Sequence, residues 1–408
     1  MSPSLVARTR RLDADVDLPA VAGRDGVLFE KGRAGLAGRG CAVRLPWPAG
    51  DPAAAARSVA AALAGIAVDD DVGLPGCGPV AFGALPFAPG AASELVVPAV
   101  VGGRADDGTR WLTTIGPTGG EPAAELPPAA EPLPPARGFT VAADRDPDDW
   151  CDLVERATKV MAGGAFDKVV LARQIDVTAD QPIDVVPVLE RLRSAYPGCH
   201  IVAVDGFVAA SPELLVSVTG DIVRSHPMAG TAPRGGDPTT DQRLAASLLA
   251  SIKDRQEHQI TIDMVHDTLL PWCSYLDYEA EPSVVAVANV QHLATLVEGR
   301  LSQPAPSVLE LVAALHPTPA VAGWPRDDAV AWIHAHEGID RRRYAGTAGW
   351  ADAAGNGTWA VSVRCAEMDG RTARVWAGNG IVPESDPPTE LAETRAKLQA
   401  LLSAIVRP

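Results

Sequence analysis

Hydrophobic residues recur with a helical period in four stretches of the C-terminal two thirds of the chain, and two glycines end the first of these stretches. Apolar positions spaced three and four residues apart are typical of one buried helix face. The spacing of apolar residues therefore predicts helices over residues 147–162, 185–196 and 388–405, and one long helix over 238–270. An Ala-rich run near 51–66 predicts a further helix in the N-terminal part.

Between these helices lie short runs of β-branched and apolar residues. Residues 167–177 predict a strand, and residues 200–230 predict β runs joined by a Thr-Gly-Asp turn. After Gly346 we expect three β segments, separated by turns at DAAGNG and MDGR. Hairpins and long helices without a regular βαβ rhythm indicate an α+β fold built on antiparallel sheet.

One stretch interrupts both patterns. Residues 115–138 are rich in Pro, Ala and Glu, a composition that cannot hold a regular element for long. We interpret this stretch as a surface connection between an N-terminal portion (1–114) and a C-terminal portion (139–408). The N-terminal portion mixes short β-like runs (CAVRLPW, PVAFGALPF, ELVVPAVV) with its one predicted helix and shows no recognisable chemistry.

Composition changes the picture mainly by exclusion. The chain has 408 residues, 47% of them hydrophobic and 21% charged, with a formal net charge of -16. Such a charge argues against nucleic-acid binding, which needs a concentrated basic face. No apolar run reaches the ~20 residues of a membrane span, and charge interrupts the N-terminus before a secretory signal could form. Six cysteines stand singly, so neither a zinc site nor a disulfide scaffold is indicated, and we expect a cytoplasmic protein.

Acidic residues form two pairs with the same spacing. Asp254 and Glu257 are three residues apart, as are Glu390 and Glu393, so each pair shares one face of a predicted helix. Magnesium favours one or two carboxylates together with water and substrate oxygens. Two such helices could build a magnesium site, although solvated acidic faces would show the same spacing.

Three other charged residues could carry chemistry. Arg364 falls late on the small, polar face of the predicted strand TWAVSVRCAE, where it could bind a carboxylate through two hydrogen bonds or simply face solvent. Lys168 opens a predicted strand, and Glu213 begins another after Ser-Pro. A lysine serves as general base only if its pKa falls from about 10.4, and a glutamate acid needs the opposite shift. Taken singly, each fits an ordinary surface charge as well.

Two glycine-rich stretches, GNGTWA and GNGIVP, lack the third glycine of a dinucleotide fingerprint. We interpret them as turns or loops whose backbone approaches a ligand. The chain also lacks a phosphate loop of the G-x-x-x-x-G-K-[ST] kind, which argues against a magnesium-dependent nucleotide enzyme.

Ten local motifs, in order, resemble the chorismate-utilising enzymes, a family of isochorismate, salicylate, anthranilate and aminodeoxychorismate synthases. They are DKVVLAR (167–173), ASPELL (210–215), HPMAGTAPR (226–234), KDRQEH (253–258), QHLATLVEGR (291–300), LHPTPAVAG (315–323), GTAGW (346–350), VSVRCAE (361–367), AGNGIVPES (377–385) and ELAETRAKL (390–398). PVAFGALPF also resembles the N-terminal part of isochorismate synthases. The resemblance implies one chorismate-binding fold, with large antiparallel sheets, outer helices and a central cleft, so that the two portions are parts of one fold.

The resemblance also assigns roles to residues. The family's base falls on Lys168 and its acid on Glu213, and its metal-binding glutamates fall on Glu257 and Glu393, with Asp254 and Glu390 at the accompanying acidic positions. Substrate contacts are implied at Gly230, Thr231, His292, Ala320, Arg364, Gly380 and Lys397. The implied cofactor is Mg²⁺ and the implied substrate is chorismate, a dianion. The metal would take its ring carboxylate and Arg364 its pyruvyl carboxylate, which would explain how an acidic protein binds an anion.

Two positions choose within the family. Anthranilate synthases generally carry glutamine where Lys168 stands, and aminodeoxychorismate synthases carry a nucleophilic lysine where Ala229 stands. A lysine base suits a water nucleophile, so the resemblance favours an isochorismate synthase, an isomerase in which water attacks C2 and the C4 hydroxyl leaves. A salicylate synthase and a non-catalytic chorismate-binding relative are the alternatives. The expected protein is a monomer without an amidotransferase subunit, and its product would feed siderophore or menaquinone synthesis.

Overall fold

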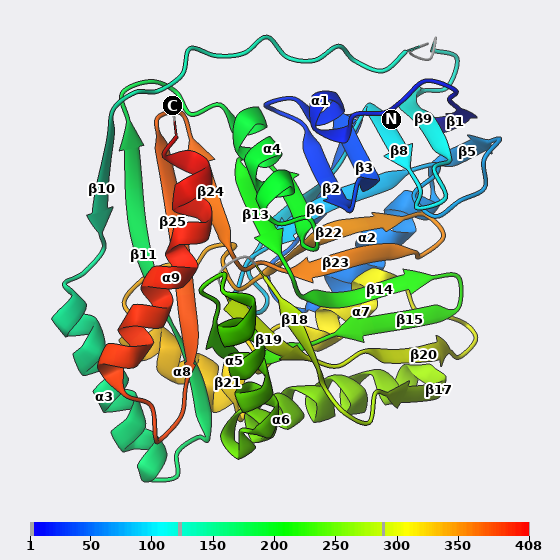
Figure 1. Ribbon diagram of the computed structural model, residues 1–408. Coiled ribbons are helices and arrows are strands. Elements are labelled where there is room, and N and C mark those ends of the chain that lie inside the picture. The colour runs from blue at the N-terminus through cyan, green and yellow to red at the C-terminus, as the bar shows by residue number, and fades with distance from the viewer. Residues whose placement is uncertain (1–3, 121–124, 288–289, 408) are drawn as a thin grey trace.

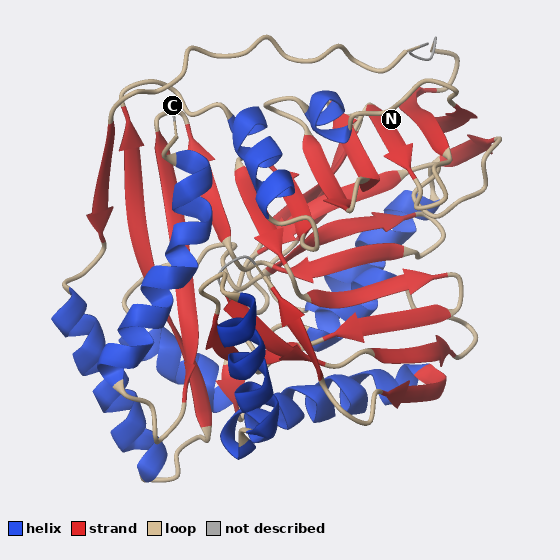
Figure 2. Cartoon of the chain, in the orientation of Figure 1, coloured by secondary structure: helices blue, strands red, loops and turns tan. Residues whose placement is uncertain are grey.

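Three β-sheets form the frame of the protein. The structure, a computed structural model, describes residues 4–120, 125–287 and 290–407. Among these residues every strand pair is antiparallel except β1 with β5, which confirms the α+β fold with large antiparallel sheets. Figure 1 shows β10, β11, β25 and β24 of the largest sheet upright on the left and its strands β8, β9, β1 and β5 at the upper right, and Figure 2 shows helices along the outside of the sheets.

Within the described ranges the largest sheet has 13 strands. In spatial order they are β10 (Phe139–Ala143), β11 (Lys168–Ala179), β25 (Thr372–Ile381), β24 (Cys365–Asp369), β13 (Phe207–Ser211), β12 (His200–Val204), β2 (Val27–Lys31), β3 (Ala34–Arg39), β8 (Val100–Arg104), β9 (Arg110–Pro117), β1 (Leu5–Arg11) and β5 (Ala67–Asp70), with β21 (Gly323–Trp324) paired to β11. Strands from residues 5–117 thus continue a sheet begun by strands from 139–381.

The second sheet has nine strands and the third has three. The order in the second is β17 (Cys273–Tyr278), β20 (Val297–Leu301), β15 (Ile222–His226), β14 (Leu214–Thr219), β23 (Gly357–Val361), β22 (Thr347–Asp352), β6 (Val80–Leu85), β7 (Ser93–Val97) and β4 (Val43–Trp47). The third consists of β16 (Met228–Pro233), β19 (Val290–Ala294) and β18 (Ser283–Ala286). The turn predicted at residues 219–221 joins β14 to β15.

Helices cover the sheets from outside. They are α1 (Leu18–Ala22), α2 (Pro52–Ala64), α3 (Pro147–Ala162), α4 (Val185–Ala195), α5 (Pro238–Ala250), α6 (Ile252–Leu269), α7 (Val308–Leu315), α8 (Arg326–His336), α9 (Pro387–Ile405) and a short 3₁₀ helix, η1 (Leu270–Trp272). The predictions for α2, α3, α4 and α9 are confirmed to within two residues at each end. In α3, Asp146 caps the first turn, Pro147 fits the first helical position and Gly163 follows the last residue.

The single helix predicted over 238–270 is wrong. Ser251 has an extended backbone and divides it into α5 and α6. Its hydroxyl accepts a hydrogen bond from the Asp254 N–H at 3.2 Å and so caps the first turn of α6. The apolar stripe is not continuous either, because Ile252 is 74% exposed. Residues that looked like one buried face belong to two helices.

The three β segments expected after Gly346 are four strands. The predicted strand TWAVSVRCAE breaks at residues 362–364, between β23 and β24. The chain crosses there from the nine-stranded sheet to the 13-stranded sheet. Alternation of side chains continues across the break, so the sequence gives no sign of it. GNGIVP, interpreted as a turn or loop, instead forms the end of β25 and the residues just after it.

Two hydrophobic layers hold these elements together. The inner layer lies between the two large sheets and contains Phe82, Phe207 and Trp359, all fully buried. The outer layer lies on the opposite face of the 13-stranded sheet, where α1, α4 and α9 pack. Burial of apolar surface on this scale is the main stabilising contribution to folding.

The predicted connection at 115–138 overlaps the end of β9 and then forms no helix or strand in its described part, 118–120 and 125–138. Residues 121–124 lie outside the description. Figure 1 shows residues 125–138 running along the top of the molecule toward β10. Arg39 binds the Pro128 carbonyl, and the Leu133 N–H binds Asp184. Within the described ranges no helix is both long and apolar enough to cross a membrane.

Candidate active site

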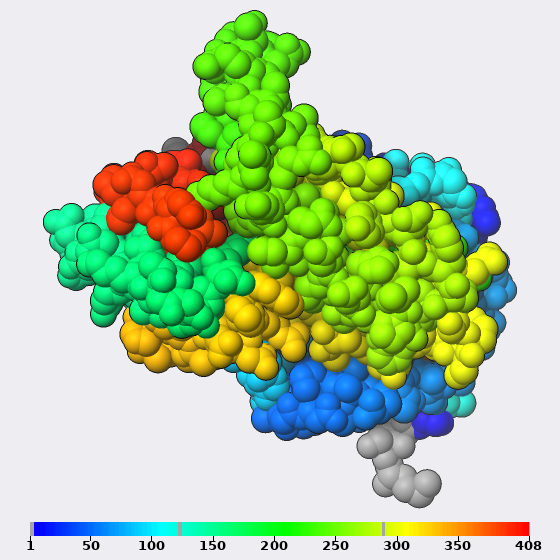
Figure 3. Space-filling view, turned by 90° about the horizontal axis from the view of Figure 1, so that it is seen from below, coloured from blue at the N-terminus to red at the C-terminus, as the bar shows by residue number. Residues whose placement is uncertain are grey.

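A pocket opens where the three sheets meet α6 and α9. It encloses about 760 Å³, including solvent at its mouth. Figure 3 shows the green segment that contains α5 projecting from the body beside the red α9. The lining residues are Val170, Pro212, Glu213, Met228, Ala229, Gly230, Thr231, Glu257, His292, Ala320, Val321, Tyr344, Val363, Arg364, Trp376, Ala377, Gly378, Gly380 and Lys397.

Nine of the thirteen residues singled out from the sequence line this pocket. They are Glu213, Gly230, Thr231, Glu257, His292, Ala320, Arg364, Gly380 and Lys397. The other four are Lys168, Asp254, Glu390 and Glu393. Lys168 and Glu393 stand just behind the wall, each paired with a lining residue. Asp254 lies against Gly230, where an added Cβ would come within 3.1 Å of the Asp254 Cβ and 3.3 Å of its Oδ1.

Glu213 enters the pocket from the short link between β13 and β14. Its backbone is fixed on both sides, since its N–H donates to the Ser211 hydroxyl at 3.3 Å and its carbonyl accepts from the Val361 N–H at 3.1 Å. The side chain is only 6% exposed. Burial raises the pKa of this carboxyl to about 7, although the Met228 N–H and the nearby cations Lys168 and Arg364 oppose the shift. A carboxyl in this state can donate a proton near neutral pH.

Lys168 reaches the pocket through Glu257. It is the first residue of β11 and is 1% exposed, and its ammonium lies 2.7 Å from Glu257 Oε1. Burial, the largest single influence, opposes ionisation of Glu257, but attraction to Lys168, the hydrogen bond from Lys168 and the charges of Lys253 and Lys397 together lower the pKa of the carboxyl. Gly380 makes room for this contact, because a Cβ there would lie 2.8 Å from Lys168 Cε and 2.9 Å from Glu257 Oε1.

Arg364 stands at the crossing between the two sheets rather than on a strand face, which corrects the prediction for this residue. Its φ is +48°, a conformation that non-glycine residues rarely adopt. The Arg364 carbonyl accepts a hydrogen bond from the Ala210 N–H, which fixes the turn. The side chain is 7% exposed, and its Nε has no hydrogen-bond partner in the described residues. A buried guanidinium with a free donor is suited to an anionic ligand.

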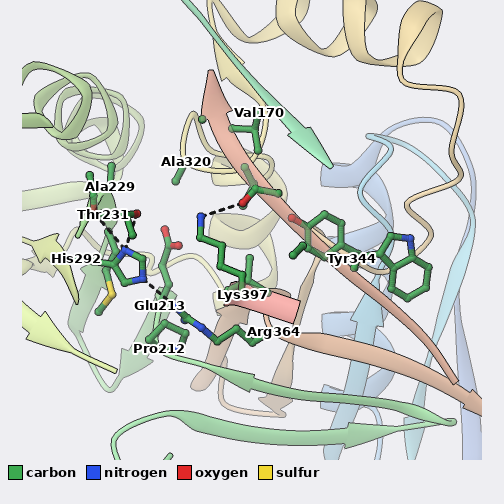
Figure 4. Close-up of a pocket in the computed structure, with 18 of the residues that line it drawn as sticks. Val170, Pro212, Glu213, Ala229, Thr231, His292, Ala320, Tyr344, Arg364 and Lys397 are labelled. Carbon is green, nitrogen blue, oxygen red and sulfur yellow. Dashed lines mark hydrogen bonds between the residues drawn. The ribbon is translucent and has the colours of Figure 1, made fainter. Parts of the chain in front are cut away.

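His292 orients Arg364. Arg364 Nη2 lies 2.8 Å from His292 Nε2, and His292 Nδ1 lies 3.2 Å from the Gly230 carbonyl and 3.1 Å from the Thr231 hydroxyl. A guanidinium can only donate, so Nε2 accepts and Nδ1 carries the proton that it donates to Gly230. Burial, followed by repulsion from Arg364, lowers the pKa of His292 well below its ordinary value. The imidazole therefore stays neutral and acts as a fixed acceptor (Figure 4).

Lys397 lies opposite, on α9. Its ammonium donates to the Gly378 carbonyl at 3.0 Å and to Asn379 Oδ1 at 2.9 Å, and it lies 2.8 Å from Glu393 Oε1. Glu390 is turned away from the pocket, and its two oxygens accept from Asn379 and Ser385. Figure 4 shows Lys397 and Glu213 pointing into the same space.

The acidic residues offer oxygen donors for a divalent cation. Glu257 lies 2.7 Å from the Lys168 ammonium, and Glu393 lies 2.8 Å from the Lys397 ammonium. Each carboxylate therefore already interacts with a positive charge. Hard carboxylate oxygens are ligands that Mg²⁺ prefers, and on this ground the residues fit the ion. Within the described ranges, however, no three His, Cys, Asp or Glu side chains are grouped closely enough to hold a metal by themselves. Water and substrate oxygens would have to complete the coordination.

Ten lining residues were not singled out from the sequence. Eight of them fall inside the quoted motifs, as Val170, Pro212 and Val321 do. Tyr344 and Trp376 fall outside. Their rings stack at 6.2 Å, and the Tyr344 hydroxyl lies against Gly378. The position of Tyr344, two residues before GTAGW, is the one signal in the sequence that could have found it.

Comparisons with known proteins agree with this geometry. The family described as "Chorismate binding enzyme" matches residues 124–406. Isochorismate synthase DhbC of Bacillus subtilis is 37% identical over 338 residues, which cover 80% of this chain and 81% of that protein. The solved structure of MenF, the menaquinone-specific isochorismate synthase of Escherichia coli, is 26% identical, has a TM-score of 0.82 and is matched over 99% of this chain and 95% of that one. Anthranilate synthase component I of Streptococcus pneumoniae, at 21% identity and a TM-score of 0.66 over 81% of each chain, shares the fold.

Proposed function

This chain belongs to the family of chorismate binding enzymes, and we propose that it is an isochorismate synthase, an isomerase that converts chorismate into isochorismate. The proposal rests on one observation above all. The nine predicted residues that line the pocket come from separate stretches between residues 213 and 397, yet they meet in one cavity. DhbC of Bacillus subtilis and MenF of Escherichia coli carry this activity in their own names.

The charges in the pocket match those of the substrate. Chorismate has two carboxylates, one on the ring and one on the enolpyruvyl group. Arg364, held by His292 and left with a free Nε, would bind the enolpyruvyl carboxylate through charge-assisted hydrogen bonds. Such local positive charge is needed in a protein whose net charge is -16.

Two side chains would move protons. As a neutral amine released from its contact with Glu257, Lys168 would take a proton from the water that attacks C2 of the ring. The ring double bonds then shift, and Glu213 would protonate the C4 hydroxyl, which leaves as water. The raised pKa of Glu213, about 7, supports the role of acid. Water is the only co-reactant, so no ammonia-supplying subunit is required.

Magnesium is the cofactor that we propose for this reaction. Glu257 and Glu393 would hold the ion, with Asp254 and Glu390 nearby, and its charge would offset that of the ring carboxylate. We expect EDTA to stop turnover and added Mg²⁺ to restore it, because without the ion the ring carboxylate would face Glu257 unshielded. Isothermal titration of the chelated protein with MgCl₂ measures binding without turnover. Full activity after exhaustive chelation, or the absence of any binding heat, would reject the metal.

Incubation with chorismate and MgCl₂ followed by chromatography tests the function. Isochorismate alone is the expected product. Salicylate together with pyruvate would identify a salicylate synthase, and unchanged chorismate would indicate a binding protein without turnover. Lys168→Ala and Glu213→Gln should each reduce isochorismate formation by ~10²–10⁴, the usual effect of losing one acid or base. Turnover like that of the wild type in either variant would remove that residue from the mechanism.

A further inference from the structure

Strand β11 carries Lys168 and one wall of the pocket, yet among the described residues part of its outer edge lacks a strand neighbour. Along its inner edge it pairs with β25 over residues 169–178. On the outer edge β21 pairs with residues 168 and 169, and β10 pairs with residues 175–179. The backbone groups between those two pairings still need partners, because unpaired buried N–H and carbonyl groups are costly.

Loop backbone meets two of these groups, since the Val170 N–H donates to the Ala322 carbonyl at 2.9 Å and the Gln174 carbonyl accepts from the Asp144 N–H at 3.1 Å. Side chains meet three others. The Val170 carbonyl accepts from Arg341 Nη2 at 2.6 Å, and the Ala172 N–H donates to Glu337 Oε1 at 2.7 Å. One step further, the Gln174 N–H donates to Asp144 Oδ1 at 3.1 Å. These three contacts follow every second residue of β11, as hydrogen bonds to a neighbouring strand would.

Glu337 and Arg341 form the centre of this arrangement. Glu337 follows α8 directly, and the two side chains are 1% and 3% exposed. Arg341 donates twice to the carboxylate, from Nη2 to Oε1 at 2.6 Å and from Nε to Oε2 at 2.7 Å. Its Nη1 donates to the Val321 carbonyl at 3.0 Å, and the guanidinium lies 4.3 Å from the centre of the Phe87 ring.

A buried ion pair contributes little to stability by itself, because desolvation of both charges offsets their attraction. What this pair does is join segments of the site. Val170 and Val321 line the pocket, and Lys168 lies two residues before Val170. The Arg341 carbonyl accepts from the N–H of Tyr344, another lining residue. Neither Glu337 nor Arg341 lines the pocket itself.

We propose that Glu337 and Arg341 are positioning residues, which hold the start of β11 and the loop at 320–321 in place. They thereby keep Lys168 and the pocket wall at fixed positions relative to the substrate. The inference rests on the proposed function for its activity readout. It predicts a loss of turnover without a matching loss of fold, because reacting groups must be held to within a fraction of an ångström.

Arg341→Lys is the most direct test. An ammonium keeps the charge but cannot donate in a planar fork to Glu337 and also to the Val170 and Val321 carbonyls. Arg343→Lys is the matched control, because Arg343 also pairs with a buried glutamate, Glu367, and donates to backbone carbonyls away from this pocket. Both proteins are assayed well below their unfolding midpoints. We expect kcat/KM to fall at least tenfold in Arg341→Lys, mainly through kcat, and less than threefold in Arg343→Lys.

Hydrogen exchange supplies a readout that does not depend on activity. We expect amides in residues 168–174 to exchange faster in Arg341→Lys and to remain as in the wild type in Arg343→Lys. Should Arg341→Lys fail to fold, Glu337→Gln keeps the volume and an acceptor for the Ala172 N–H, and the same two readouts apply to it. Equal losses of kcat/KM in test and control variants, or unchanged exchange in 168–174, would overturn the proposal. Absence of isochorismate with the wild type would count against the proposed function alone, and exchange would then decide this inference.

Discussion

Burial gives Glu213 the protonation state that a general acid needs, and the same burial predicts a dependence of stability on pH. The pKa of the carboxyl is about 7 in the folded protein, against 4.5 for an ordinary glutamate. As pH rises from 4.5, the unfolded chain releases this proton first, so the folded state loses stability until about pH 7 and then no more. The loss is about 3 kcal/mol.

Glu213→Gln removes the titratable carboxyl, so its stability at different pH values can be compared with that of the wild type. Urea unfolding of both proteins at pH 5 and pH 8 measures the effect. We expect the wild type to lose stability relative to Glu213→Gln over this range. Parallel changes in the two proteins would show that the carboxyl titrates as an exposed glutamate does.

Arg364 shows how geometry selects one cation over another. His292 occupies one of its donors, and Nε is free for an anion. Arg364→Lys would keep a charge but lose the fork, and a hydrogen bond to a charged group is worth about 1.5–3 kcal/mol. We expect kcat/KM for chorismate to fall roughly 10- to 100-fold. Steady-state kinetics of Arg364→Lys measures this fall in kcat/KM. The control is Arg374→Lys, which changes a partly exposed arginine paired with Asp176. Equal kcat/KM values for the two variants would exclude Arg364 as a substrate anchor.

At the level of elements, the end of β25 leaves room at the pocket through glycines at positions 378 and 380, while Trp376 and Ala377 of the same strand line it with side chains. Gly380 leaves the space in which Lys168 meets Glu257. Gly380→Ala should therefore displace one of these side chains and reduce turnover at least tenfold while the sheet remains folded. Gly116→Ala, at a strand glycine with no atom within 4 Å of the added Cβ, is the control. Circular dichroism and turnover of both variants test the idea, and an active Gly380→Ala would show that the gap is dispensable.

Some helices and strands could be predicted from the sequence, and others could not. Helices such as α3 were predictable because a capping aspartate, a proline and a terminal glycine bound one apolar stripe. The break at Ser251 was missed because the apolar spacing continues through it. The crossing at residues 362–364 was missed for the same reason, since alternation does not reveal that a chain passes from one sheet to another.

At the scale of the whole molecule, the pocket depends on contacts between distant parts of the chain. The motifs identified residues that would lie together, but hydrophobic periodicity could not predict which contacts between distant segments bring them together. Glu337 and Arg341 are the clearest example, since their partners Val170 and Ala172 lie more than 160 residues earlier in the chain. Such pairs carry no local signal, because a buried ion pair and a surface pair have the same i, i+4 spacing.

Turnover of chorismate in H₂¹⁸O tests the central claim most directly, because water is proposed both to attack the ring and to leave it. Mass spectrometry of the product, beside Lys168→Ala as the inactive control, gives the result. The account predicts isochorismate that carries one ¹⁸O atom, with none incorporated when the reaction is run in ordinary water. Unlabelled isochorismate, formed by transfer of the substrate's own hydroxyl, or no isochorismate at all would contradict it.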